Sequence, residues 1–207
     1  MNKILKNCRK NMENKEFYND YMKIFLEENS KVNLISKNDE KYLWEKHIFD
    51  SLALEKFFDK YEKPKTMLDI GTGGGFPALP VSLTYPEIKV TAIDSIAKKI
   101  RAVQSMKDKL GLKNLVAVCD RVENTDGKFD LVTSRAVSSL KNICEYALPK
   151  LYKGGYFVAY KSRKTPEEIE EAKNILKKYN SKIVDIIEYD LPLGEKITRN
   201  LIVIKHL

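Results

Sequence analysis

The most informative segment of the chain is Met67-Leu68-Asp69-Ile70-Gly71-Thr72-Gly73-Gly74-Gly75-Phe76-Pro77. A short apolar run leads into a glycine turn, and Pro77 suits the first turn of a helix because its φ is fixed. Glycines at such a turn let the backbone approach a ligand at the carboxyl edge of a sheet, where doubly wound folds bind nucleosides. No Lys-Ser or Lys-Thr follows, and Phe76 stands where G-x-G-x-x-G needs glycine. The sequence therefore predicts a nucleoside ligand without a pyrophosphate.

Short apolar runs predict seven strands, at residues 66–70, 89–94, 114–119, 129–134, 156–161, 183–189 and 201–205. Segments such as 96–110 and 137–151 are long enough for crossover helices. Apolar strands that alternate with helices indicate a mostly parallel sheet covered on both faces. The last two strands are joined only by residues 190–200, so we expect an antiparallel pair at one edge. The predicted fold class is α/β, a doubly wound, seven-stranded, mostly parallel sheet, whose ending is typical of methyltransferases rather than dinucleotide oxidoreductases.

The chain divides near Lys63-Pro64-Lys65. Before this point the apolar spacing of Phe17, Tyr21, Ile24 and Phe25 predicts an amphipathic helix. A second helix is expected from Asp39 to Tyr61, after a connector at residues 31–36. The predicted organisation is therefore a small N-terminal helical extension at 1–62 and a catalytic domain at 63–207.

Candidate ligand-binding residues lie at or just after the ends of the next three predicted strands. Asp94 lies about 20 residues past the first glycine, where an acid accepts hydrogen bonds from ribose hydroxyls; the alternative is a helix cap, which Ser95 supplies equally well. Val122 and Glu123 follow the third strand, where an adenine ring would lie. Arg135 follows the fourth strand, next to the expected position of a reactive methyl group.

The end of the fourth strand restricts the acceptor of such a methyl group. Enzymes that methylate exocyclic amines usually carry Asn or Asp followed by Pro-Pro and an aromatic residue there, whereas this chain has Ser134-Arg135-Ala136. Methylation at C5 of a pyrimidine usually needs a cysteine nucleophile, and Cys119 and Cys144 are poorly placed for that role. An acceptor that is already nucleophilic, such as guanine N7, needs only positioning.

The chain resembles the bacterial small-subunit ribosomal RNA methyltransferase G family, also called glucose-inhibited division protein B. The resemblance rests on the glycine turn, on Asp94-Ser95 with Lys98-Lys99, on Arg121-Val122-Glu123 and on Ser134-Arg135-Ala136. It extends from about Asn33, through the segment His47-Ile48-Phe49-Asp50-Ser51-Leu52, to Lys205. This chain departs from the family at three positions: it has Ala78 where the family often has Gly, Lys99 where the family often has Arg, and Ser162 where the family often has Gly.

The resemblance implies a class I S-adenosylmethionine-dependent enzyme that methylates N7 of one guanine in 16S ribosomal RNA near the decoding site. The residues expected to bind the cofactor are Gly71, Thr72, Gly73, Phe76, Asp94, Val122, Glu123 and Arg135. No catalytic base is expected, and Arg135 is the suspected positioning residue. Two alternatives remain open: a methyltransferase of this fold that acts on a small molecule or protein, and a non-catalytic RNA-binding module.

Charge and composition support a nucleic-acid partner. The 207 residues hold 37 Lys and Arg against 29 Asp and Glu, a net charge of +8, which favours polyanions. The basic residues expected to contact RNA are Lys98, Lys99, Arg121, Lys161 and Arg199. Arg121, Arg135, Lys161 and Arg199 fall at or beside predicted strand ends, so several of them are expected to converge on one rim. His47, Asp50 and Ser51 share one helical face, which serves either the cleft or the docking of the helix.

The three cysteines, Cys8, Cys119 and Cys144, form neither an even disulfide framework nor a CxxC pair. Together with the two histidines they are too few for a usual zinc site. We interpret Cys119 and Cys144 as buried reduced thiols. No apolar run has the length of a membrane span or a secretory signal. We therefore expect a cytoplasmic monomer without a metal, whose partner is 16S ribosomal RNA or the small ribosomal subunit.

Overall fold

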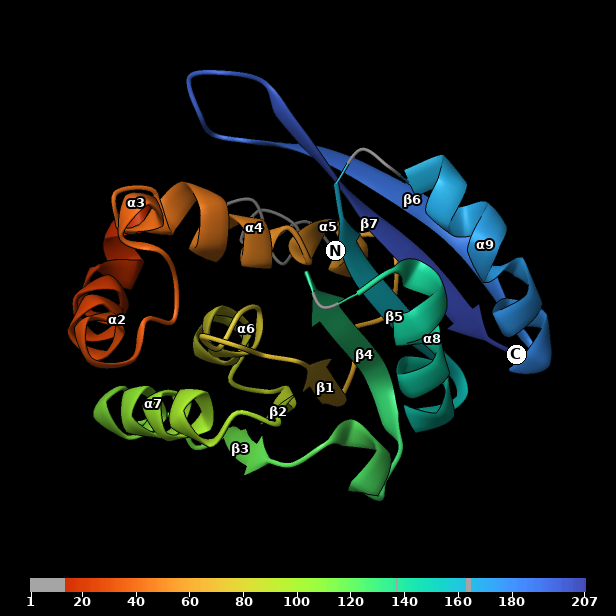
Figure 1. The fold of residues 1–207 in the computed structure, drawn as a ribbon, viewed down its shortest axis with the longest axis horizontal. Helices are drawn as coiled ribbons and strands as arrows, with labels where there is room; N and C mark the ends of the chain where they lie inside the picture. Colours follow the sequence, from red (N-terminus) through yellow and green to blue (C-terminus); the bar gives the residue numbers. More distant parts are fainter. Residues whose placement is uncertain (1–13, 137, 163–164) are drawn as a thin grey trace, which may run out of the picture.

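The computed structural model describes residues 14–136, 138–162 and 165–207. Its centre is a seven-stranded sheet of order β3-β2-β1-β4-β5-β7-β6 (Figure 1). The strands are β1 (Thr66–Ile70), β2 (Lys89–Asp94), β3 (Leu115–Cys119), β4 (Phe129–Arg135), β5 (Leu151–Lys161), β6 (Ser181–Leu191) and β7 (Ile197–His206). The first five are parallel, and β7 runs antiparallel to both β5 and β6. The predicted sheet and its antiparallel edge pair are confirmed.

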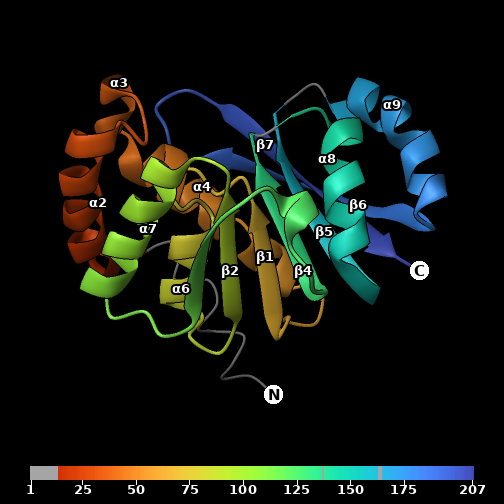
Figure 2. The same cartoon turned by 60° about the horizontal axis from the view of Figure 1, so that its bottom comes forward.

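Helices cover both faces of the sheet (Figure 2). The helices that follow β1 and β2 are α6 (Ala78–Thr84) and α7 (Ala97–Lys109); on the other face lie α8 (Leu140–Ala147), with a 3-10 turn η4 (Leu148–Lys150), and α9 (Thr165–Lys178). Alternate strand residues supply the two cores, as the period of a strand requires. Met67 belongs to the core under α6 and α7, and its neighbour Leu68 to the core under α8 and α9. The sheet is thus doubly wound.

The N-terminal lobe, residues 14–62, packs on the α6 face. It contains the 3-10 turn η1 (Lys15–Tyr18), α2 (Asn19–Val32), α3 (Lys37–Glu40), the π-helical turn η2 (Trp44–Ile48), α4 (Phe49–Leu52) and α5 (Glu55–Phe58). Phe25 of α2 lies 5.0 Å from the ring of Phe76, centroid to centroid. The lobe and the first face of the sheet share one continuous hydrophobic core. The division at residue 62 therefore stays a prediction about chain organisation.

The prediction of one continuous helix from Asp39 to Tyr61 is wrong. The structure has four short helical segments there, and Ser36 caps the first by accepting a hydrogen bond from the N–H of Asp39. The N–H of Ala53 donates to the carbonyl oxygens of Phe49 and Asp50 at 3.1 and 3.3 Å, and the N–H of Leu54 donates to that of Ser51 at 3.4 Å. Such i→i−3 hydrogen bonds tighten the backbone and interrupt the α-helical ladder.

The cysteine interpretation is correct for one residue and wrong for another. Cys144 in α8 is buried, whereas Cys119 is exposed. Cys119 ends β3, which lies at the edge of the sheet, and an edge strand has a less covered surface than a central one. Cys8 lies outside the described residues. Among the helices that the structure describes, none is long and apolar enough to cross a membrane.

Candidate functional site

The turn between β1 and α6 has a backbone that residues other than glycine rarely adopt. Gly71, Gly73 and Gly75 have φ angles of 68°, 57° and 90°, in the left-handed region that glycine enters without a Cβ penalty. The N–H groups of Gly71 and Thr72 donate to the carbonyl oxygen of Ile93 at 2.9 and 3.0 Å. The end of β2 thus holds the turn at the carboxyl edge of the sheet.

Gly75 marks the place where the turn packs most tightly on α6. An added Cβ would lie 2.3 Å from Cδ1 of Leu79. We expect Gly75→Ala to lower the free energy of unfolding by about 3 kcal/mol, because backbone strain and overpacking add. Gly154→Ala is the matched control, since φ is +84° and nothing lies within 4 Å of the new Cβ. Urea unfolding compares the two variants, and equal losses would contradict the packing argument.

A first cavity of about 580 Å³ opens at this turn. All eight residues predicted to bind a cofactor line it: Gly71, Thr72, Gly73, Phe76, Asp94, Val122, Glu123 and Arg135. Lining residues that the sequence did not predict include Leu34, Ile35, Ile143 and Tyr146. They come from the N-terminal lobe and from α8, and no local motif indicates that these elements reach the glycine turn.

Asp94 ends β2 and joins the glycine turn to the next helix. One carboxylate oxygen accepts a hydrogen bond from the N–H of Gly73 at 3.0 Å, and the other accepts one from Ile96 at 2.9 Å. The cap residue of α7 is Ile96 and its side chain makes no capping bond, so Ser95 does not supply the cap. Each carboxylate oxygen still has acceptor capacity, and Asp94 lines the first cavity. The arrangement suits vicinal hydroxyls of a ribose.

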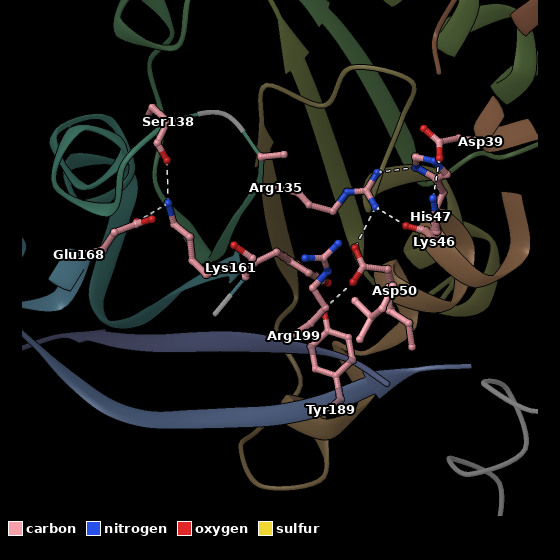
Figure 3. Close-up of a pocket in the computed structure, with 15 residues that line it drawn as sticks. Asp39, Lys46, His47, Asp50, Arg135, Ser138, Lys161, Glu168, Tyr189 and Arg199 are labelled. Atoms are coloured by element: carbon pink, nitrogen blue, oxygen red, sulfur yellow. Dashed lines mark hydrogen bonds and ion pairs between the residues drawn. The ribbon is translucent and has the colours of Figure 1, made fainter. Parts of the chain in front are cut away.

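A second cavity of about 700 Å³ lies beside the first. It is lined by residues of the N-terminal lobe, the end of β4, β5, β6, β7 and α9, which Figure 3 draws as sticks. Lys161 and Arg199 line this cavity, whereas Arg121 and Lys99 line the first. Arg135 lines both, so the expected convergence holds for three of four basic residues. Lys98 lies away from both cavities, in a small groove between α2 and α7.

Arg135 fixes the N-terminal lobe against the sheet (Figure 3). One terminal nitrogen donates to the Asp50 carboxylate at 2.9 Å and to the Lys46 carbonyl at 3.2 Å. The other lies 3.1 Å from Nδ1 of His47, and the guanidinium carbon is 5.1 Å from the centroid of Phe76. Five N–H donors in a fixed fork make such multiple contacts possible. The sequence predicted a shared helical face for His47 and Asp50 but not their common partner.

Asp50 is itself held by the sheet. The hydroxyl of Tyr189 donates to its other carboxylate oxygen at 2.7 Å, and the Asp50 side chain is only 8% exposed. Nearby, the hydroxyl of Tyr160 donates to the carbonyl oxygen of Ser51 at 2.8 Å. A buried carboxylate needs such compensation because desolvation penalises its charge. The polar face of this helical segment therefore docks the lobe and also builds the wall between the two cavities.

Two buried titratable groups flank the site with opposite shifts. Burial raises the pKa of Asp69 to about 6, while the hydroxyls of Thr72 and Thr133 oppose the rise. Burial and, to a smaller extent, the charge of Arg135 lower the pKa of His47 to about 4. Because a guanidinium only donates hydrogen bonds, Nδ1 of His47 accepts from Arg135 and the ring is neutral. His47 is thus an acceptor that orients Arg135.

These shifts predict opposite pH dependences of stability. Between about pH 4 and 6, Asp69 binds more protons in the native state than in the unfolded chain, so its contribution to stability falls as pH rises. Between about pH 4 and 6.5, His47 binds fewer protons in the native state than in the unfolded chain, so its contribution to stability increases as pH rises. As pH rises through these windows, the free energy of unfolding of Asp69→Asn should increase relative to that of the wild type, by up to about 3 kcal/mol. The free energy of unfolding of His47→Gln should decrease relative to that of the wild type, also by up to about 3 kcal/mol. Urea unfolding at successive pH values measures both differences. A difference that does not vary with pH would contradict the corresponding assignment.

Comparison with known proteins decides the family. The model of rRNA small subunit methyltransferase G matches residues 14–190. The chain belongs to this family. Ribosomal RNA small subunit methyltransferase G of Staphylococcus haemolyticus is 39% identical over 184 residues, 86% of this chain and 76% of that protein. The protein of the same name from Bacillus licheniformis is 38% identical over 197 residues, 92% of this chain and 81% of that protein.

Solved structures share the fold of this family member. TYW2 of M. jannaschii in complex with AdoMet has a TM-score of 0.55 at 17% identity, over 70% of this chain and 68% of that one. A SAM-dependent O-methyltransferase of Thermotoga maritima has a TM-score of 0.56 at 17% identity, over 76% of this chain and 64% of that one. The sheet is that of the class I S-adenosylmethionine-dependent methyltransferases, with helices added at the N-terminus.

Proposed function

We propose that this protein transfers a methyl group from S-adenosylmethionine to N7 of a guanine in 16S ribosomal RNA, near the decoding site. Family membership over residues 14–190 carries the proposal. The first cavity supports it, because a glycine turn and the carboxylate of Asp94 meet there as a nucleoside site requires.

The residues of the first cavity fit this cofactor. A Cβ added to Gly73 would have the carbonyl oxygen of Gly71, at 3.9 Å, as its nearest neighbour, so the turn leaves open space where the ligand approaches. In the proposed arrangement Gly71 and Phe76 bound the methionine and ribose end, Asp94 binds the ribose, and Val122 with Glu123 frames the adenine. When bound, the cofactor supplies a methyl group on a positively charged sulfur.

The end of β4 supports a nitrogen acceptor that carries no proton. Ser134 donates its hydroxyl to the carbonyl oxygen of Ile70 at 3.1 Å, and the following residues are Arg135 and Ala136. This segment has no carboxylate or carboxamide to draw a proton from an amine. Guanine N7 has a free lone pair, so positioning alone supplies the rate enhancement. Arg135 is the residue proposed to position the reactants.

Basic side chains around the two cavities are proposed to contact the RNA. Lys99 and Arg121 lie at the first cavity, and Lys161 and Arg199 at the second. Lys161 forms an ion pair of 2.7 Å with Glu168, so it holds α9 as well as facing the cavity. Lys98 is proposed as a peripheral phosphate contact, since its groove also contains Lys31 and Arg101.

We propose that the monomer is active, and light scattering after size exclusion tests this. Among the residues that the structure describes, no group of three or more His, Cys, Asp or Glu side chains forms a metal site, and we propose metal-independent transfer. We also propose that the protein acts in the cytoplasm, because its proposed substrate is part of bacterial ribosomes.

The proposed function is tested with small subunits from a strain that lacks this gene. Labelled S-adenosylmethionine, the protein and these subunits are incubated, and label in 16S RNA is counted. Transfer to the RNA, together with calorimetric binding of S-adenosylhomocysteine, is expected. Cofactor binding without transfer to subunits or their RNA would favour a small-molecule or protein substrate, and no binding would favour an RNA-binding module.

A further inference from the structure

The two cavities meet at a narrow boundary. They share three lining residues, His47, Arg135 and Ala136. Ala136 has a φ of 56°, a left-handed conformation that is rare for residues with a Cβ and that clusters at functional sites. The boundary therefore lies directly after β4, where the backbone turns sharply between two spaces.

The first cavity is already accounted for by the nucleoside of the cofactor. In the proposed arrangement Asp94, Val122 and Glu123 bind the ribose and the adenine, and Arg135 with Ala136 lies at the boundary with the second cavity. Methyl transfer is an in-line displacement, so the attacking atom must approach the methyl group from the side opposite to the sulfur. A methyl group at the boundary would thus face an acceptor in the second cavity.

The charges of the second cavity suit a neutral polar group beside an anion. Three carboxylates and four cations line it: Asp39, Asp50, Glu168, Lys46, Arg135, Lys161 and Arg199. Each carboxylate forms an ion pair of 2.7–2.9 Å with one cation. Within residues 14–136, 138–162 and 165–207, Arg199 is the cation of this set without an ion pair, and in Figure 3 it lies between Lys161 and Asp50.

We propose that the second cavity binds the target guanosine of the RNA, with Arg199 beside its phosphate; this rests on the proposed function. A volume of about 700 Å³ falls within the range of small-molecule sites. We expect the nucleotide to enter this cavity unpaired or turned out of its helix, as in enzymes that act on a single base. The N-terminal lobe supplies one wall of this site through His47 and Asp50.

The test fills the second cavity without touching the first. Ile197 begins β7 and lines the second cavity only, so Ile197→Trp places a large ring in the proposed base site. Ile186→Trp is the matched control, because Ile186 is 42% exposed on β6 and lines neither cavity. Ile197→Phe provides a smaller ring in case tryptophan prevents folding. Circular dichroism and thermal unfolding verify the fold of each variant, and calorimetry with S-adenosylhomocysteine measures its cofactor affinity separately.

We expect Ile197→Trp to lower kcat/KM for unmethylated small subunits on the order of 100-fold, with cofactor affinity unchanged and the Ile186→Trp control near the wild type. Wild-type transfer by an Ile197 variant that binds cofactor normally would overturn the assignment. Loss of cofactor affinity in a folded Ile197 variant would also overturn it, because the second cavity would then belong to the cofactor.

A second measurement separates the site from the reaction. Guanosine 5′-monophosphate is titrated at millimolar concentration into protein saturated with S-adenosylhomocysteine, and saturation-transfer NMR reports its binding. The assignment predicts binding by the wild type and the Ile186→Trp control, and its loss in Ile197→Trp. Binding that is unaffected by Ile197→Trp, or absent in the wild type, contradicts the assignment. Ile197-dependent binding in a protein that transfers no methyl to RNA would contradict only the proposed function.

Discussion

Gly73→Val is expected to weaken binding of S-adenosylhomocysteine by at least about 100-fold, because its side chain occupies the space through which the turn meets the ligand. The wild-type protein has room for an added Cβ at this position, whose nearest neighbour would be 3.9 Å away. The loss is therefore steric exclusion of the ligand and not a clash within the protein. Isothermal titration calorimetry measures the affinity.

The matched control is Gly111→Val. Gly111 has a φ of +65°, close to the +57° of Gly73, and nothing lies within 4 Å of its added Cβ. It follows α7 and lines neither cavity. Both variants should lose a similar amount of stability, on the order of 2 kcal/mol, from the left-handed backbone. Weakened cofactor binding in Gly111→Val as well, or normal binding in Gly73→Val, would contradict the placement of the cofactor at the turn.

Arg135→Ala is expected to abolish most methyl transfer and also to destabilise the protein. The Arg135 and Asp50 side chains are 16% and 8% exposed, and loss of one partner leaves a buried charge uncompensated, a loss of about 3–5 kcal/mol. Transfer should fall on the order of 100-fold because the boundary between the cavities loses its positioning group. Activity is measured at a temperature where the variant is folded by circular dichroism.

A second substitution separates the two effects. Asp50→Asn removes the charge, and its amide oxygen still accepts the hydrogen bond of Tyr189. Arg135→Ala with Asp50→Asn should therefore regain much of the stability, while methyl transfer stays low. A double variant that regains both stability and transfer would make Arg135 purely structural. Substitutions of two charged residues in direct contact are expected to have non-additive effects on the free energy of unfolding.

Local patterns predicted the parallel half of the sheet well. The bounds of β1 and β2 agree with the prediction, and Asp94 lies where its spacing from Gly71 placed it. Buried parallel strands are continuous apolar runs between turn residues, so their ends are visible in the sequence. The strands β6 and β7 are longer than predicted because polar residues such as Lys182, Asp190 and Thr198 extend their ladder, and β5 begins earlier because Leu151 pairs with Phe129 ahead of a register shift.

The parts of the site that were not predicted come from contacts between distant segments. Tyr146 is 40% exposed on α8 and lines the first cavity, yet its own sequence neighbourhood is that of an ordinary amphipathic helix. Tyr189 contacts Asp50 across 139 positions of the chain. Period and propensity report on neighbours within a few residues, so they cannot indicate which strand or helix reaches a cavity wall.

The position of the methyl group on the RNA is the decisive measurement for the proposed function. Small subunits from a strain lacking the gene are treated with the protein and deuterated S-adenosylmethionine, and the 16S RNA is digested and mapped by mass spectrometry. The account predicts one labelled guanine per RNA, with the chemistry of an N7-methylguanine. Label on an exocyclic amine, on a ribose or on a pyrimidine, or no label at all, would contradict it.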